Sequence, residues 1–284
     1  MLFDTFIYPV KHVKSIRDEL ELSESDDAYL IECDSQRTND IEKHIKKFKL
    51  RSKINIRPEN GFKTWWVSRL DFNTQREGND TIGCIDLRAP GMGLRIITQE
   101  NRIPGEEETS DIDVLPLETY NIQRMMLGIA EGQDEIFYNA STPLECNLDI
   151  AGAVDFKKGC YIGQELTART HHTGVVRKRI VPVQFYMKGE SINEDNSHPI
   201  YDPEFIINPP KAQTNVIKEG KIGRQQGKIC ASLGNIGLAN IRLDTILAGE
   251  TLSVASETDV EQKRLLLKAF IPAWWPKSVL SQIG

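Results

Sequence analysis

The residue best suited to chemistry in this chain is Cys160, which lies in the motif Lys158–Glu165 (sequence KGCYIGQE). Tyr161–Thr170 has helical composition, and Gly159 permits a tight turn ahead of it. A thiol at the N-terminus of this helix, beside two lysines, would be stabilised as a thiolate by the helix dipole and by the nearby charges. The pattern predicts a reactive or metal-binding cysteine, and a small buried cysteine is the alternative.

Positive charge gathers around this cysteine. Residues 157–179 hold six basic side chains and one carboxylate, Glu165, which gives +5, whereas the whole chain carries −6. Such a patch suits an anionic ligand or an acidic partner. Alternatively, it neutralises an acidic face elsewhere in the fold. The six basic residues are Lys157, Lys158, Arg169, Arg177, Lys178 and Arg179.

Two histidines, His171 and His172, follow the motif and leave further chemistry open. With Cys160 they could supply at most a partial zinc site, and adjacent helical residues point in different directions. A cysteine hydrolase built on Cys160 and one histidine is also open, although no hydrolase motif accompanies it. One cysteine cannot hold an iron–sulfur cluster alone, so any such cluster must borrow ligands from another molecule.

Composition excludes several protein classes. The net charge of −6 argues against bulk nucleic-acid binding. No apolar run approaches the roughly 20 residues needed to span a bilayer, so we expect no membrane partner. The five cysteines are widely spaced and include no C-x-x-C pair, which favours a reducing compartment over a disulfide framework.

The first half of the chain predicts an α+β layer. An amphipathic helix begins near Asp34 or Ser35, with Ile41, Ile45 and Phe48 on its apolar stripe. Its lysines at 43, 46, 47 and 49 lie mostly off that stripe and form either a solvated face or a partner-docking surface. Strands are predicted by alternating or β-branched runs. They are Leu2–Tyr8, Ala28–Cys33, Ile54–Ile56, Thr64–Leu70, Thr81–Leu87 and Leu94–Thr98.

The second half begins with a predicted helix, Leu117–Glu131, that Gly132 would end. After Val175, short strand-like runs alternate with turn residues, which predicts a small β-barrel or sandwich. The runs are Val181–Tyr186, Lys228–Ser232, Gly237–Arg242 and Thr251–Ala255.

The Lys158–Glu165 motif closely resembles the signature of the YgfZ family, relatives of the glycine-cleavage T-protein (GcvT) that act in iron–sulfur protein maturation. Pro143–Leu148 looks like the folate-facing segment of that family. Leu166–Arg179 and Ile271–Pro276 are most similar to its mitochondrial branch. The resemblance extends over essentially the whole chain.

This resemblance implies a three-domain GcvT/YgfZ-like ring around a hole that takes tetrahydrofolate. Two ferredoxin-like α+β domains and a C-terminal β-barrel are expected. We expect the second α+β domain at 1–105, the remainder of the first at 106–175 and the barrel at 176–284. Family members carry further residues ahead of the point matching Met1, so the first domain is expected to be incomplete at its N-terminus. In mitochondrial members a transit peptide precedes those residues, and this implies the mitochondrial matrix.

The resemblance also implies roles for residues. Cys160 would share a transient [2Fe–2S] cluster with an A-type carrier protein during maturation of 4Fe–4S client enzymes, and Lys158 is the lysine of the motif. An aminomethyltransferase of the T-protein type is the enzymatic alternative, although the T-protein does not use this thiol. A pure interaction module is another, so enzymatic activity stays open. The implied folate contacts are Glu145, Asn147, Tyr161, Gln164, Glu165 and Arg169.

Overall fold

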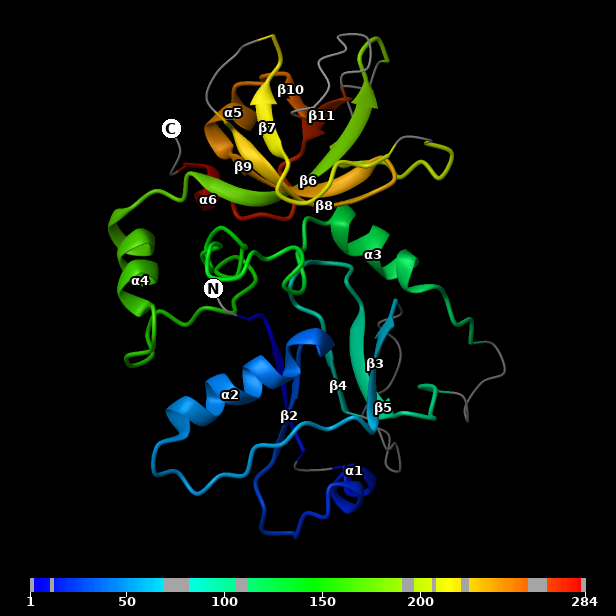
Figure 1. Ribbon diagram of the computed structural model, residues 1–284, viewed down its shortest axis with the longest axis vertical. Helices are drawn as coiled ribbons and strands as arrows, with labels where there is room; N and C mark the ends of the chain where they lie inside the picture. The colour runs from blue at the N-terminus through cyan, green and yellow to red at the C-terminus, as the bar shows by residue number, and fades with distance from the viewer. Residues whose placement is uncertain are drawn as a thin grey trace. The chain divides into compact units, whose positions relative to one another are not determined.

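The computed structural model describes residues 3–10, 13–68, 82–105, 112–190, 197–205, 208–220, 225–254 and 265–281. The chain forms two compact units (Figure 1). Unit 1 comprises residues 1–2, 87–90 and 116–284, and unit 2 comprises residues 3–86 and 91–115. The expected division into three domains stays a prediction, whereas the mixed helix and strand content confirms the α+β class.

Unit 2 contains two small antiparallel sheets. In one, β1 (Phe6–Pro9) pairs with β2 (Tyr29–Glu32). In the other, β5 (Leu94–Gln99) lies between β3 (Phe62–Val67) and β4 (Ile82–Ile85). These strands confirm five of the predicted runs with shifted bounds; the ends of some runs, such as 69–70 and Thr81, lie outside the described residues.

The helices of unit 2 follow their apolar positions. Asp34 accepts a hydrogen bond from the backbone of Gln36 at the start of the short 3-10 helix η1 (Ser35–Arg37), which leads into α2 (Thr38–Lys49). Of the predicted apolar stripe, Ile41 is buried and Ile45 half-buried, but Phe48 is 45% exposed, so the stripe is wrong at its last position. A further helix, α1 (Lys14–Glu19), buries Ile16 and was not predicted.

The predicted strand at Ile54–Ile56 is wrong, because residues 53–60 form no strand. Ile54 and Asn55 are exposed, so the alternation in the sequence is not matched by a buried face. Short alternating runs of this kind carry little information without a partner strand.

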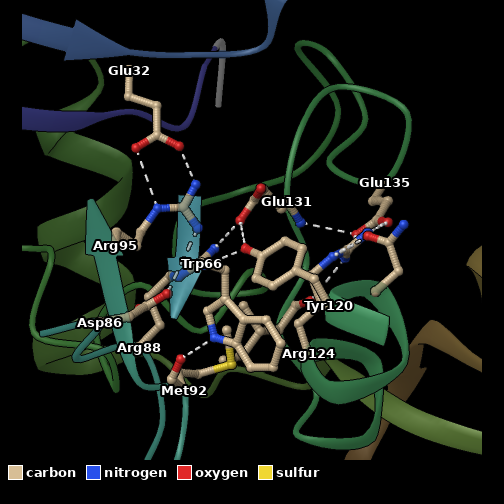
Figure 2. A network of polar contacts seen from close by, with 12 residues as sticks. Glu32, Trp66, Asp86, Arg88, Met92, Arg95, Tyr120, Arg124, Glu131 and Glu135 are labelled. Atoms are coloured by element: carbon tan, nitrogen blue, oxygen red, sulfur yellow. Dashed lines mark hydrogen bonds and ion pairs between the residues drawn. The ribbon is translucent and has the colours of Figure 1, made fainter. Parts of the chain in front are cut away.

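A buried charged network holds the core of unit 2 together (Figure 2). The Arg95 guanidinium forms an ion pair with Glu32, lies 3.8 Å from Asp86 and stacks over the Phe6 ring at 4.3 Å. The Tyr8 hydroxyl donates to the same Glu32 carboxylate at 2.7 Å. Because Glu32 and Tyr8 come from the β1–β2 sheet and Arg95 from β5, this network links the two sheets of the unit.

Unit 1 contains a closed six-stranded antiparallel barrel (Figure 1). The predicted strands correspond to four of these, and two short strands, β7 and β11, were missed. The order around the barrel is β10 (Leu252–Val254), β11 (Leu265–Ala269), β6 (Lys178–Met187), β9 (Ile236–Arg242), β8 (Gly227–Leu233) and β7 (Asn215–Lys218).

Both faces of β6 are buried, because one lines the barrel and the other packs against the rest of unit 1. Val181, Val183 and Phe185 belong to the inner cluster. Ile180 instead packs with Met125 of α3 (Leu117–Met126), and α3 lies against β6 and β9. Helix α3 therefore packs on the outside of the barrel, and the segment between α3 and β6 is held there by its two ends.

Helix α3 ends at Met126, one turn before the predicted end at Glu131. Gly128 takes φ +80°, and the Ile129 amide then donates back to the Arg124 carbonyl at 2.9 Å. A positive φ at this position closes the helix, so Gly128 and not Gly132 provides the stop. None of the helices in the described part of the chain is both long and apolar enough to cross a membrane.

Candidate functional site

Cys160 is exposed, on a loop that precedes α4 (Gln164–Thr173). The predicted helix start immediately after Cys160 is wrong, because Gly163 takes φ +84° and the helix begins only at Gln164. The thiol is therefore not at a helix N-terminus. The predicted buried alternative for this cysteine is also wrong in this structure, since the side chain reaches solvent.

The turn after Cys160 is held by its own hydrogen bonds. The Tyr161 amide donates to the Gln164 side-chain oxygen at 3.2 Å, and the Gln164 amide donates back to the Tyr161 carbonyl at 3.1 Å. The Thr167 hydroxyl donates to the Gly163 carbonyl at 3.2 Å. These bonds make Gln164 a residue that positions the motif, and Gly163 provides the conformation that the turn needs.

A ring stack joins the start of this loop to α4. The rings of Phe156 and His171 lie nearly parallel, with centroids 3.6 Å apart, and His171 meets His172 edge-on at 5.0 Å. Residues 156 and 171 thus fix the ends of the segment that carries the thiol. Within the described ranges, no three His, Cys, Asp or Glu side chains gather closely enough to hold a metal ion.

The surface around the thiol is apolar and basic. Tyr161, Ile162 and Leu166 are 42%, 66% and 51% exposed. The polar members of this surface are also exposed, namely Lys157, Lys158, Glu165, Arg169 and Arg177. Exposed apolar side chains that lie close in the sequence to exposed cations suit a partner with both apolar and acidic groups.

Arg179 corrects the predicted patch, because its side chain is only 2% exposed. Its guanidinium forms a two-pronged ion pair with Asp149, with both N–O distances 2.8 Å, and donates to the Leu144 carbonyl at 2.6 Å. The charge of Arg179 is therefore used inside unit 1. It fastens the 143–152 turns to strand β6 instead of attracting a ligand.

Two of the expected folate contacts also support these turns. Glu145 accepts hydrogen bonds from the Thr142 amide and hydroxyl, both at 3.1 Å, while the Glu145 amide donates to the Thr142 hydroxyl oxygen at 3.3 Å. This is a capping box. The buried Asn147 takes φ +63° and donates to the Ile180 carbonyl of β6 at 2.7 Å. The expected contacts thus fall into two groups, Glu145 and Asn147 in the turns and the others at the motif.

Unit 1 also holds an ionic network that the sequence did not predict (Figure 2). Arg124 pairs with Glu135 through bonds of 2.6 and 2.5 Å. Burial alone would lower the pKa of Arg124, but hydrogen bonding and attraction from Glu135 raise it above the usual range, so the guanidinium stays charged. Arg88 and the Tyr120 hydroxyl both bind Glu131, at 2.7 and 2.5 Å. The partners in these pairs are eleven to 43 residues apart in the sequence, so no local sequence pattern predicted them.

The other four thiols have different surroundings. Cys146 and Cys230 are buried in one apolar cluster, and burial raises the pKa of Cys230. Desolvation also raises the pKa of Cys33, which is half-buried. Cys84 is accessible, but desolvation and the nearby Asp86 raise its pKa as well. The raised pKa keeps the Cys33, Cys84 and Cys230 thiols in the neutral form, which is the less reactive one.

Similarity to known proteins identifies the family. Residues 177–277, which include all six barrel strands, match the family described as CAF17, C-terminal beta-barrel domain. The chain is 39% identical over 322 residues to the mitochondrial iron–sulfur cluster assembly factor IBA57 homolog of Aspergillus fumigatus, covering 96% of this chain and 69% of that protein. The chain belongs to the family of IBA57 iron–sulfur cluster assembly factors. The IBA57 homolog of Neurospora crassa is 34% identical, covering 96% and 70%, and that of Pyricularia oryzae 36%, covering 99% and 74%.

Membership of the IBA57 family confirms the resemblance drawn from the Lys158–Glu165 motif, and it places the chain among the GcvT/YgfZ-like proteins. It also agrees with the closed barrel. The relatives are named as mitochondrial proteins, which confirms the predicted mitochondrial localisation.

Proposed function

We propose that this chain matures mitochondrial 4Fe–4S proteins by sharing a [2Fe–2S] cluster, through the Cys160 thiolate, with an A-type carrier. The cluster is cargo. On binding, a bond forms between the Cys160 sulfur and iron, and the thiol proton leaves to solvent. The carrier supplies the remaining ligands, because one thiolate cannot hold the cluster.

The observation that carries this proposal is the presentation of Cys160. The thiol is exposed on a short loop whose turn is fixed by the Tyr161–Gln164 hydrogen bonds and whose start is joined to α4 by the Phe156–His171 stack. A cluster bridging two proteins needs a thiol that is accessible and held in one place. The cysteines buried in the core of unit 1 do not meet the first condition.

The surroundings of the thiol supply the docking face. Ile162 and Leu166 are more than half exposed, and we propose that they pack against the carrier. The exposed Lys157, Lys158 and Arg169 flank them and steer an acidic partner. Client iron–sulfur enzymes would then receive the cluster from the carrier complex in the matrix.

Anaerobic reconstitution with a purified A-type carrier tests the proposal. The wild-type chain is expected to form a coloured heterocomplex, followed by absorption and size-exclusion chromatography. Cys160→Ser should abolish the complex while leaving thermal unfolding unchanged, because the side chain is exposed and the change is nearly isosteric. Cys84→Ser, at the other exposed cysteine, is the matched control and should behave as wild type.

Retention of the coloured complex by Cys160→Ser would contradict a shared cluster. Turnover of an aminomethyl donor by both Cys160→Ser and wild type would instead favour a transferase of the T-protein type.

We further propose tetrahydrofolate as the small-molecule ligand of unit 1. When bound, tetrahydrofolate would act as a carrier of one-carbon units. Tyr161, Glu165 and Arg169 are exposed and fit a ring system with an anionic glutamate tail. Gln164, Glu145 and Asn147 already make protein hydrogen bonds, so their contribution is to hold the motif and the 143–152 turns in position.

Calorimetric titration with tetrahydrofolate tests the role of Arg169. Arg169→Ala should weaken binding by about tenfold, as expected for the loss of one charge-assisted hydrogen bond. Arg37→Ala, at an exposed arginine of unit 2, is the control and should leave the affinity unchanged. Equal affinities in wild type and Arg169→Ala would remove this arginine from the folate site.

A further inference from the structure

Segment 43–57 of unit 2, which covers the second half of α2 and the residues that follow it, is strongly basic. It contains seven lysines and arginines and no carboxylate, so its formal charge is +7, in a chain of net charge −6. Charge of this density is unfavourable unless it serves solubility or a partner. The basic residues are Lys43, Lys46, Lys47, Lys49, Arg51, Lys53 and Arg57.

Most of these charges face solvent. Helix α2 turns Ile41 inward, which leaves Lys43, Lys46 and Lys47 exposed on its outer side. Arg51 and Lys53 are exposed in the segment that follows the helix. Three of the seven have local partners, since Lys46 pairs with Glu42, Arg57 pairs with Glu59, and the Lys47 ammonium lies over the Phe48 ring at 5.6 Å. The surface is therefore cationic along the helix and past its end.

Apolar side chains are exposed among these cations. Leu50 is 86% exposed, Ile54 49% and Phe48 45%. They lie at the end of α2 and just beyond it, between Lys47 and Arg57 in the sequence. Three exposed apolar side chains within one basic segment suit a partner that has both negative charge and an apolar part.

Leu50 gives a second, independent observation. It caps α2 with φ +49° and ψ −116°, a backbone conformation that glycine adopts readily and leucine does not. The chain thus holds a strained residue whose large apolar side chain points into water. Local strain kept at an exposed position indicates a function for the side chain.

We propose that segment 43–57 binds the surface of an anionic phospholipid membrane. The lysines and arginines contact the headgroups, and Phe48, Leu50 and Ile54 enter the interface between headgroups and acyl chains. Nucleic acid would use the same charges, but its phosphates give no partner for an exposed leucine or isoleucine. The predicted absence of a membrane partner rested on spanning segments, whereas attachment to a surface needs none. This site is independent of Cys160.

Co-sedimentation of the whole chain with lipid vesicles tests the proposal. The probes are vesicles of phosphatidylcholine alone and of phosphatidylcholine mixed with phosphatidylglycerol, at low and at high ionic strength. The wild-type chain should sediment with the anionic vesicles only, and less at high salt, because the attraction is screened. Lys43→Glu/Lys47→Glu should reduce the binding constant for anionic vesicles by about tenfold or more.

The matched control is Lys14→Glu/Lys63→Glu, which changes the net charge equally at two exposed lysines of unit 2 outside the segment. It should bind as wild type. Leu50→Gly tests the apolar component: it should weaken vesicle binding by several-fold without unfolding the chain, because glycine relieves the positive φ.

The proposal would be overturned if the wild-type chain did not sediment with anionic vesicles. Equal losses in the two lysine variants would overturn it too, because they would indicate bulk charge alone. Vesicle binding that Leu50→Gly leaves unchanged would also overturn it and would favour nucleic acid or an acidic protein as the partner.

Discussion

Arg179 illustrates what decides the role of a single residue. It stands in a stretch of basic residues, yet its side chain is 2% exposed and is paired with Asp149. The partner lies thirty residues away, so nothing local in the sequence separates Arg179 from the exposed Arg177. Removing a buried charge from such a pair leaves the other charge unpaired, and this costs more than the pair contributes.

Arg179→Ala should therefore lower the free energy of unfolding by about 3–5 kcal/mol. Arg177→Ala, two residues earlier and exposed, should change it by less than about 0.5 kcal/mol. Chemical denaturation of the two variants measures the difference. Similar midpoints for both would contradict the structural role of the Arg179–Asp149 pair.

The motif around Cys160 was predictable at this scale because it needs only residue types and spacing. Its local geometry was not. The positive φ of Gly163 delays α4 by several residues, and a glycine in a sequence does not reveal the sign of its φ. The Arg124–Glu135 and Arg88–Glu131 pairs were invisible for the same reason as Arg179: the partners meet only in the folded chain.

At the scale of elements, glycines with positive φ set where helices and turns end. Gly128 terminates α3, and a Cβ there would lie 2.8 Å from the Pro182 ring of β6. Gly152 has a similar φ of +71°, but nothing lies within 4 Å of its Cβ position. The two sites share the conformational cost of a side chain and differ in the steric cost.

Gly128→Ala should consequently destabilise the chain by more than Gly152→Ala. We expect about 1–2 kcal/mol for the unfavourable φ at either site, with a further 1–3 kcal/mol at Gly128 for overpacking against Pro182. Thermal unfolding of the two variants, followed by circular dichroism, compares them. Equal destabilisation would mean that α3 can shift away from β6 without cost.

The same scale shows where prediction from sequence works. Strands β6, β8 and β9 were found because they carry long buried apolar runs. Length alone does not decide the outcome for the short strands, since β10 was found and the slightly longer β7 and β11 were missed. The segment Ile54–Ile56 had the alternation of a strand but no partner to pair with. Strand pairing is a property of two segments, so periodicity in one of them is an incomplete guide.

At the scale of the whole molecule, the two proposed binding sites lie in different units. Unit 1 carries the barrel, the motif and Cys160, and unit 2 carries the basic segment 43–57. The barrel could be predicted from the sequence because its turn-rich short strands are distinctive. The three-domain division could not be derived from the residues alone, since it depends on family resemblance.

Tyr8 is a titratable member of the network through which Glu32 and Arg95 join the two sheets of unit 2, and this predicts how the molecule responds to alkali. Burial, followed by the adjacent Glu32 carboxylate, raises the pKa of Tyr8 above its ordinary value near 10. The folded chain therefore keeps the phenol neutral at a pH where the unfolded chain ionises it. The stability that Tyr8 contributes is complete below about pH 10 and falls as the pH rises further, by about 1.4 kcal/mol for each pH unit.

Tyr8→Phe should show the opposite balance. At neutral pH the variant should be less stable by about 0.5–1.5 kcal/mol, because the hydrogen bond to Glu32 is lost. Above about pH 10 its stability should fall less steeply than that of wild type, because one ionisation that opposes folding has been removed. Tyr29→Phe, at a 58%-exposed tyrosine of the paired strand β2, is the control and should follow wild type throughout. Unfolding free energies measured across the alkaline range decide the matter: parallel curves for wild type and Tyr8→Phe would mean that the link between the sheets does not depend on the protonated phenol.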